Sequence, residues 1–199
     1  MSDVHADLST ELAAASNVLV LEDGSSSVRE RVHETLLAGF SDDPTDVLAV
    51  TFSRPEPWLD AWEDRLPTDD ANLGLVQLTE TGGWEGKRGS AHVRSVDPSD
   101  LTGLGMAVRD FFDGVASSPR PAVACFDSVT GLCEYNEVRT LFRFLRVITQ
   151  QVQTEGATAH FHVDPVAHDQ QSLARLKPPF DAHVEIGNGE DSVSVSTPY

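Results

Sequence analysis

Apolar and polar positions follow two alternating patterns along the chain. Short runs rich in apolar residues occupy 18–21, 47–52, 73–78, 91–96, 121–126 and 158–163, and several of them are closed by Asp, Gly or Pro. Such runs are typical of buried strands. Between them, apolar residues recur at three- and four-residue steps, which predicts amphipathic helices. Strands that alternate with helices predict an α/β domain with a mostly parallel sheet.

The spacing of apolar residues predicts where the helices lie, and the remaining segments predict a loop and a final pair of strands. Apolar side chains recur at Val28, Val32, Leu36 and Phe40, at Trp58, Trp62 and Leu66, at Leu101, Leu104 and Val108, and from Tyr135 to Val152 in what we predict as the longest helix. We expect an exposed loop at 79–90, a helix that Ser99 or Asp100 caps, a short helix at 165–176, and an antiparallel pair at 180–186 and 193–196. The resulting prediction is a single three-layer domain over 17–199, with helices on both faces, after a loosely held leader at 1–16.

Composition narrows the class of protein. The 199 residues carry 14 basic and 32 acidic side chains, a formal net charge of −18, which argues against nucleic-acid binding. No apolar run approaches the ~20 residues of a membrane span, and the first residues do not resemble a signal peptide. Lys87 and Lys177 are the only lysines, and the scattered acidic residues predict a high-salt cytoplasm. Cys125 and Cys133 are expected to be free thiols, the first an inert part of a strand.

The loop after the first strand stands where a phosphate-binding loop would stand. That loop requires G-x-x-x-x-G-K-[ST], because its backbone amides and lysine surround the phosphates. Residues 21–29 read LEDGSSSVR, so the lysine and the other glycine are missing, and Glu22 and Asp23 add negative charge. We expect a serine to cap the next helix. The candidate residues of this degenerate loop are Gly24, Ser25, Ser26, Ser27 and Arg29.

Several segments carry a resemblance to a known group. Residues 122–132, AVACFDSVTGL, resemble the Walker B strand and following stretch of the RecA/KaiC superfamily, and 51–56 and 180–186 continue the likeness. The segments DLTGLG (100–105), FRFL (142–145) and HFHVDP (160–165) are similar to a haloarchaeal family of unknown function related to KaiC-like ATPases. The resemblance, over 17–186, implies a RecA/KaiC-like P-loop NTPase core. It places Asp127 at the Walker B position, which orients magnesium, and Glu56 near a catalytic glutamate.

The missing lysine decides the functional prediction. Without it Asp127 has no phosphate-bound magnesium to orient, so we expect this residue to be a structural cap satisfied by backbone amides or Ser128. We predict a non-catalytic domain without a cofactor, which acts by protein–protein interaction as a regulatory or scaffold component. The alternative is a nucleotide-binding ATPase with a rebuilt loop that uses Arg29 and Asp127.

Histidines suggest a third function. His160, His162 and Asp164 alternate on a predicted strand and therefore share one face, with His168 shortly after them. The candidate metal ligands are His160, His162 and His168, which would make a metal-dependent hydrolase. The other interpretation is that these histidines are hydrogen-bonding groups along the edge of the sheet.

Candidate partner surfaces lie on a loop and on the longest helix. Trp84, in the glycine-rich loop, is a candidate exposed anchor. Arg139, Arg143 and Arg146 form a basic stripe in an otherwise acidic chain. The stripe is either a solvated helix face or a docking surface for an acidic protein partner or for a second copy in a homodimer.

Overall fold

The computed structural model describes residues 8, 10–22, 27–37, 45–56, 59–60, 71–88, 91–187 and 193–197, with backbone only at 27, 28 and 30. Its strands are β1 (Asn17–Glu22), β2 (Asp46–Thr51), β3 (Leu73–Leu78), β4 (Gly86–Arg88), β5 (Ala91–Val96), β6 (Ala122–Asp127), β7 (Thr158–Val163), β8 (Ala182–Ile186) and β9 (Val193–Ser196). Its helices are α2 (Ser27–Leu37), α4 (Leu101–Val115), α5 (Val129–Tyr135), α6 (Val138–Thr154), the 3₁₀ turn η1 (Pro165–Ala167) and α7 (Gln170–Leu176).

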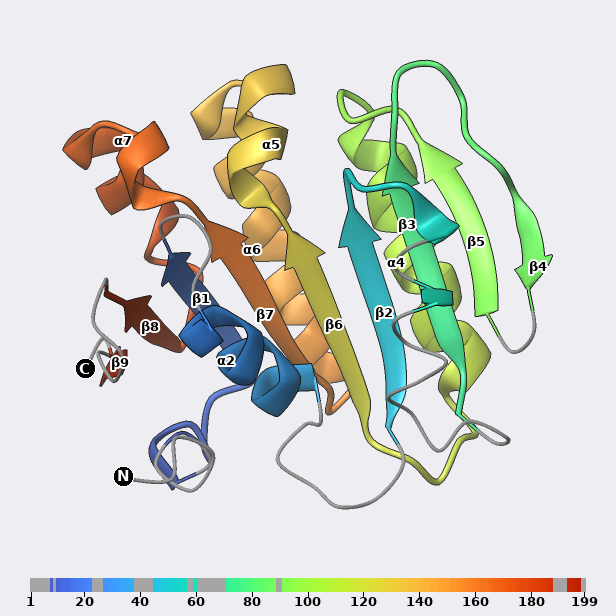
Figure 1. Cartoon of the computed structure of the whole chain (residues 1–199), viewed down its shortest axis with the longest axis horizontal. Helices are drawn as coiled ribbons and strands as arrows, with labels where there is room; N and C mark the ends of the chain where they lie inside the picture. The colour runs from blue at the N-terminus through green and yellow to red at the C-terminus, as the bar shows by residue number, and fades with distance from the viewer. Residues whose placement is uncertain are drawn as a thin grey trace.

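The nine strands of the described chain form one sheet in the order β4-β5-β3-β2-β6-β7-β1-β8-β9. All neighbours are parallel except the edge pairs β4–β5 and β8–β9. Helix α2 lies on one face of the sheet, and α4 and α6 lie on the other (Figure 1). The predicted three-layer, mostly parallel α/β fold with an antiparallel edge after 180 is therefore confirmed.

Alternation along the central strands explains how both faces become buried. Leu19 and Leu21 of β1 pack in the core under α4 and α6, whereas Val18 and Val20 of the same strand pack with Val32 of α2. Successive side chains of a strand point to opposite faces. A strand that is covered on both faces must therefore be apolar at nearly every position, which is the origin of the short apolar runs in the sequence.

Two helical predictions were wrong in detail. The predicted longest helix is two helices, because Asn136 adopts an extended conformation between α5 and α6. Its Nδ2 donates hydrogen bonds to the carbonyl oxygens of Leu132 and Pro98, at 3.0 and 2.8 Å. These bonds satisfy the end of α5 and tie it to the loop before α4. The predicted helix at 165–176 is likewise divided into η1 and α7.

The segment predicted as an exposed loop at 79–90 also differs, because it contains the edge strand β4. Asp100 is the N-cap of α4, and its side chain accepts a hydrogen bond of 2.8 Å from Gly103 N. The predicted helix around Trp58 and Trp62 falls largely outside the described residues. So does the turn at Asn188-Gly189.

The N-terminal segment packs more closely than predicted. Leu8 and Leu12 are 2% and 1% exposed and belong to the core between α2, β1 and β8, so a loosely held leader does not describe them. Residues 1–7 and 9 lie outside the described part of the chain. Among the described residues, no helix has the length and apolar character needed to cross a membrane.

Candidate functional site

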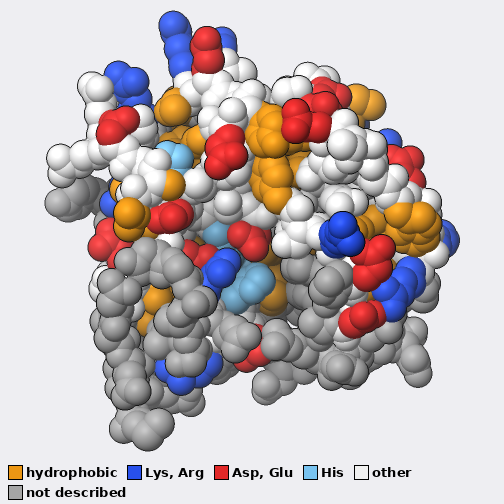
Figure 2. Space-filling model, turned by 45° about the horizontal axis from the view of Figure 1, so that its top comes forward, with side chains coloured by type: hydrophobic (Ala, Val, Ile, Leu, Met, Phe, Trp, Pro, Cys, Tyr) orange, Lys and Arg blue, Asp and Glu red, His pale blue; other side chains and the backbone are white. Residues whose placement is uncertain are grey.

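The carboxyl ends of β1 and β6 carry the acidic residues that the sequence analysis selected. Both strands border β7, so Glu22 at the end of β1 and Asp127 at the end of β6 lie at the same edge of the sheet, where α/β proteins bind ligands. Figure 2 shows charged and histidine side chains gathered near the centre of this edge. Of the candidate loop residues, Gly24, Ser25 and Ser26 lie outside the described chain, and Ser27 begins α2.

Arg29 lies between the two carboxylates. Its Nε donates a hydrogen bond of 2.7 Å to Glu22 Oε1, and its Nη2 is 3.8 Å from Asp127 Oδ2. The Glu22 side chain is only 7% exposed, compared with 30% for Asp127. Burial on its own would raise the pKa of Glu22, but His162 and Arg29 outweigh burial and lower it. Glu22 is therefore a buried carboxylate that stays charged because it has cationic and hydrogen-bonding partners.

Asp127 does not have the capping role that we expected. Ser128 is the N-cap of α5, and its hydroxyl accepts a hydrogen bond of 3.1 Å from Gly131 N. Asp127 instead forms the ion pair with Arg29. Glu56 is exposed beyond the end of β2.

Four side chains from three elements meet beside these carboxylates on the α2 face of the sheet. We call them the His–Cys cluster, which consists of His33 of α2, Cys125 of β6, and His160 and His162 of β7. Each offers one ligand atom, and these atoms all lie within 4.8 Å of one another. The strand register explains part of the assembly, because Cys125 is paired with His160 across β6 and β7. His162 shares the face of His160, since it lies two residues further along the strand.

Burial shifts the pKa values of two members of the cluster, His160 and Cys125, toward their neutral forms. Burial, together with the neighbouring His162 and His33, lowers the pKa of His160 well below its ordinary value. Burial, with the nearby carboxylates of Asp127 and Glu22, raises the pKa of the Cys125 thiol well above its ordinary value. His33 Nε2 lies 3.2 Å from Cys125 Sγ. Cys125 is therefore a buried thiol rather than an activated thiolate.

The structure brings together two of the three predicted metal ligands. His160 and His162 are in the His–Cys cluster, but His168 is not, because it follows η1 and its Nε2 lies 3.0 Å from Thr130 Oγ1 of α5. Asp164 caps η1 by accepting a hydrogen bond of 2.8 Å from Val166 N. Sequence reasoning missed His33 and Cys125. The sequence carried no signal for either residue, because their positions depend on the adjacency of β6 and β7 in the sheet and on where α2 crosses it.

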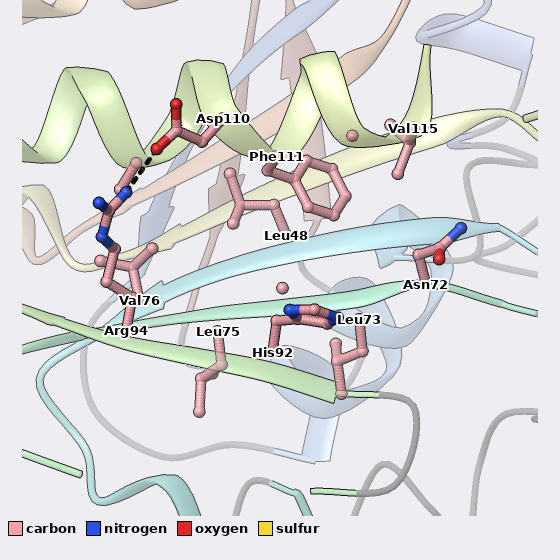
Figure 3. Close-up of a pocket in the computed structure, with 13 residues that line it drawn as sticks. Leu48, Asn72, Leu73, Leu75, Val76, His92, Arg94, Asp110, Phe111 and Val115 are labelled. Carbon is pink, nitrogen blue, oxygen red and sulfur yellow. Dashed lines mark hydrogen bonds and ion pairs between the residues drawn. The ribbon is translucent and has the colours of Figure 1, made fainter. Parts of the chain in front are cut away.

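A separate cavity of about 250 Å³ lies under α4, on the other half of the sheet. In Figure 3, Phe111 points from α4 toward the strands, His92 lies below it, and the ion pair between Arg94 and Asp110 closes one side. None of the site residues predicted from the sequence lines this cavity. It is therefore distinct from the edge at Glu22 and Asp127.

A third surface follows α4 and α6 on the face away from α2. Met106 of α4 and Val147 of α6 are 58% and 64% exposed, and both line an open groove together with Arg143. The predicted basic stripe of Arg139, Arg143 and Arg146 is exposed on α6. Trp84, the predicted anchor, is 47% exposed, but it lies between β3 and β4 and does not line this groove. The apolar and cationic groups of this face are thus accessible to a partner.

Comparison with known proteins gives a family and a fold. The family model described as a family of unknown function (DUF7504) matches residues 15–186, and no curated protein matches the chain. The chain is similar to the crystal structure of the uncharacterized protein PH0321 from Pyrococcus horikoshii in complex with an unknown peptide, with 14% identity, a TM-score of 0.61, and coverage of 96% of this chain and 86% of that one.

Two further solved structures have the same architecture. The flagellar accessory protein FlaH from Methanocaldococcus jannaschii has 14% identity, a TM-score of 0.56, and coverage of 98% of this chain and 83% of that one. A structural study of PH0250 from Pyrococcus horikoshii OT3 gives 12% identity, a TM-score of 0.56, and coverage of 91% and 85%. These likenesses confirm the expected mostly parallel α/β fold, which the chain shares with these structures, and they show the fold alone. The haloarchaeal origin and the loss of the nucleotide loop stay predictions.

Proposed function

The chain belongs to the family of unknown function (DUF7504), and we propose that it is a non-catalytic RecA-like domain that acts by binding another protein. In this proposal it is a regulatory or scaffold component in a high-salt cytoplasm. One observation carries the proposal: Arg29, the one basic residue in 21–29, is engaged by the two carboxylates of Glu22 and Asp127.

Electrostatics explain why this arrangement disfavours a nucleotide. A triphosphate is held by cations and amides that are arranged around its charge before it arrives. Here a phosphate would have to compete with Glu22 for Arg29 across a 2.7 Å contact, and it would lie near Asp127 as well. Breaking a partly buried ion pair leaves the remaining charge without its partner, which is costly. Residues 21–29 contain no lysine that could take over the role of Arg29.

The groove between α4 and α6 supplies the interaction surface in this proposal. Exposed apolar groups at Met106 and Val147 lie beside Arg143, while the whole chain carries a net charge of −18. A basic stripe on an acidic protein attracts an acidic surface more than it attracts a basic one. The occupant that fits is therefore an acidic protein segment that also presents an apolar side chain. A second copy of this acidic chain is one candidate.

Calorimetry tests the non-catalytic part of the proposal. ATP with Mg²⁺ is titrated into the whole chain and into Arg29→Ala, in buffer with molar KCl and again at low salt. We expect no heat of binding for either protein. A micromolar dissociation constant that Arg29→Ala abolishes would overturn the proposal and favour the ATPase with a rebuilt loop. Micromolar binding that survives in Arg29→Ala would overturn it as well.

Affinity isolation tests the interaction part. The chain, Arg143→Glu and the control Arg175→Glu are used as baits in cell extract at high salt, and recovered proteins are quantified by mass spectrometry. Arg175 is exposed on α7, so the two variants change the net charge equally at different places. We expect a partner that the wild type and Arg175→Glu retain and that Arg143→Glu loses at least about tenfold, a change of about 1.4 kcal/mol. Equal recovery of the partner by the wild type and by Arg143→Glu would rule out the groove between α4 and α6 as the interaction surface.

Sedimentation velocity distinguishes the source of that partner. A concentration-dependent dimer that Arg143→Glu dissociates and Arg175→Glu preserves would identify a second copy as the occupant. A monomer at all concentrations, combined with an Arg143-dependent partner in the extract, would identify a different acidic protein. A monomer without such a partner would overturn the interaction proposal.

A further inference from the structure

The strongest unexplained feature of the molecule is the chemistry of the His–Cys cluster. Three imidazole rings meet edge to face, with centroid separations of 5.0 to 5.4 Å, and a thiol lies beside them. They come from α2, β6 and β7, so the fold rather than the local sequence brings them together. The other face of β7 carries only the apolar residues Ala159, Phe161 and Val163 over the same stretch, so the polar groups are confined to the α2 face.

Two nitrogens of this cluster are buried without a hydrogen-bond partner in the described part of the chain. His160 Nε2 and His162 Nε2 have no hydrogen-bond partner among the described residues. The two residues are only 1% and 2% exposed. A buried polar atom without a partner costs about 1–3 kcal/mol, and most such atoms in proteins are satisfied. Each of these two histidines offers one ring nitrogen to the cluster, and the four ligand atoms of the cluster lie within 4.8 Å of one another.

Glu22 gives His162 the orientation that a metal ligand requires. His162 Nδ1 lies 3.0 Å from Glu22 Oε1. When Nδ1–H donates to this carboxylate, the lone pair of the neutral ring is at Nε2, the nitrogen that is buried without a partner among the described residues. Histidine ligands of metals commonly donate their other N–H to a carboxylate, which fixes the ring and its tautomer. Arg29 holds the same Glu22 oxygen from α2 at 2.7 Å, so the orienting carboxylate is itself fixed.

We propose that the His–Cys cluster is a structural zinc site that ties α2 to β6 and β7. Three imidazole nitrogens and one thiolate are a donor set that suits Zn²⁺, which prefers four ligands in a tetrahedron. All four positions are filled by protein groups, which is the pattern of structural rather than hydrolytic sites. Binding displaces the Cys125 thiol proton to solvent. The site is independent of the proposed function, because it needs neither nucleotide nor partner.

Cobalt spectroscopy on the whole chain tests the ligand set directly. Co²⁺ is added to metal-free protein in the presence of excess Mg²⁺, which occupies surface carboxylates. We expect intense tetrahedral d–d absorption and a thiolate-to-cobalt charge-transfer band, both lost when one equivalent of Zn²⁺ is added. Weak octahedral absorption without a charge-transfer band would overturn the proposal, and this readout on the wild type needs no variant that might fail to fold.

The two cysteines provide a matched pair of variants. Cys125→Ser should lose the charge-transfer band, whereas Cys133→Ser should keep it, because Cys133 belongs to α5 and is not part of the cluster. Zinc content after purification without chelator should be about one ion per chain for the wild type and for Cys133→Ser, and far lower for His162→Gln. Equal zinc and equal cobalt spectra in Cys125→Ser and the wild type would overturn the proposal.

Glu22→Gln tests the role of the positioning residue. The amide is a weaker acceptor than the carboxylate, so we expect the affinity for Co²⁺ to fall about 10- to 100-fold with the tetrahedral spectrum retained. An unchanged affinity would contradict the orienting role of Glu22. A changed ligand set, seen as loss of the charge-transfer band, would contradict it too.

Discussion

Nε of Arg29, in the first turn of α2, donates a hydrogen bond of 2.7 Å to Oε1 of Glu22 at the end of β1. The same oxygen lies 3.0 Å from His162 Nδ1. One nearly buried carboxylate therefore joins the position of the degenerate phosphate loop to the His–Cys cluster. The arrangement makes Arg29 a structural residue in the proposed non-catalytic domain, since it compensates the charge that Glu22 carries into the protein.

The first prediction concerns Arg29→Ala. The substitution removes the cation from Glu22 and from Asp127, and the half-exposed position of Arg29 reduces the effect through solvent screening. We expect the free energy of unfolding to fall by about 1–2 kcal/mol, measured by urea denaturation followed by circular dichroism. Arg31→Ala is the control, because Arg31 is exposed on the same helix and should change stability by less than about 0.5 kcal/mol. Equal losses in both variants would contradict the role of the Glu22 contact.

The second prediction is a pH dependence that arises from Asp46 at the start of β2. Asp46 is fully buried, and its Oδ1 accepts hydrogen bonds from Asn72 N at 2.8 Å and from Arg120 Nε at 3.0 Å. Burial would raise the pKa of Asp46, but hydrogen bonds from Ser118, Asn72 and Arg120 outweigh burial and hold it below its ordinary value. The stability that Asp46 contributes is therefore present above the unfolded pKa of about 3.9, and it is lost as the pH falls through the lower folded value.

Asp46→Asn isolates this contribution from the rest of the acidic chain. At pH 7 we expect the variant to be less stable by about 1–3 kcal/mol. Acidification also relieves repulsion among the other carboxylates, but it does so in both proteins, so this effect cancels in their difference. The difference in unfolding free energy should shrink between about pH 5 and about pH 3. A difference that stays constant over this range would show that Asp46 does not titrate as inferred.

The third prediction tests the packing of α4 on β3. A Cβ added at Gly74 would lie 2.7 Å from Phe111 Cδ2 and 3.2 Å from Leu48 Cδ1. The Phe111 ring, which borders the cavity under α4, would have to give up its contact with β3, and we expect Gly74→Ala to destabilise the protein by about 1–3 kcal/mol. Gly114→Ala, on α4, is the control, since a Cβ there meets nothing within 4 Å and alanine favours helix by about 0.5–1 kcal/mol. Thermal denaturation should therefore move the two variants in opposite directions.

Much of the fold was readable from the sequence because its strands are buried on both faces. The predicted bounds of β3 and β5 agree with the structure. The break between α5 and α6 was missed because the apolar spacing of Tyr135, Val138 and Leu141 continues across it. Local periodicity does not report that Asn136 can satisfy α5 through its own side chain. Asn favours helix ends for this reason, and that was the overlooked signal.

The candidate site was only partly readable. The two-residue period of a strand predicted that His160 and His162 share a face. It could not predict His33 or Cys125, because their positions depend on the order of β6 and β7 and on where α2 crosses the sheet. Cys125 looked like an ordinary small residue in an apolar strand. The residue paired with Cys125 on the neighbouring strand β7 is His160. This pairing, and not the sequence around Cys125, places the thiol beside the imidazole rings of the cluster.

The last prediction concerns the reactivity of the two thiols in the metal-free folded chain. Cys133 is half-buried, and burial raises the pKa of its thiol to about 11. Cys125 is 0% exposed, and burial with nearby carboxylates raises the pKa of its thiol well above the ordinary value. Since the thiolate is the reactive form, we expect iodoacetamide at pH 8 to modify Cys133 about 100-fold more slowly than a free peptide cysteine. Cys125 should react more slowly still.

Peptide mass spectrometry at successive times gives both rates in one experiment. Cys125 is covered by α2 on one side, with His33 in contact with its sulfur, so its modification should follow opening of the structure. In urea, where this cover is lost, both cysteines should react at similar rates. If Cys125 reacts before Cys133 in the folded chain, α2 opens from β6 while the rest of the fold persists. The contact between His33 and Cys125 would then not hold the helix in place without a metal ion.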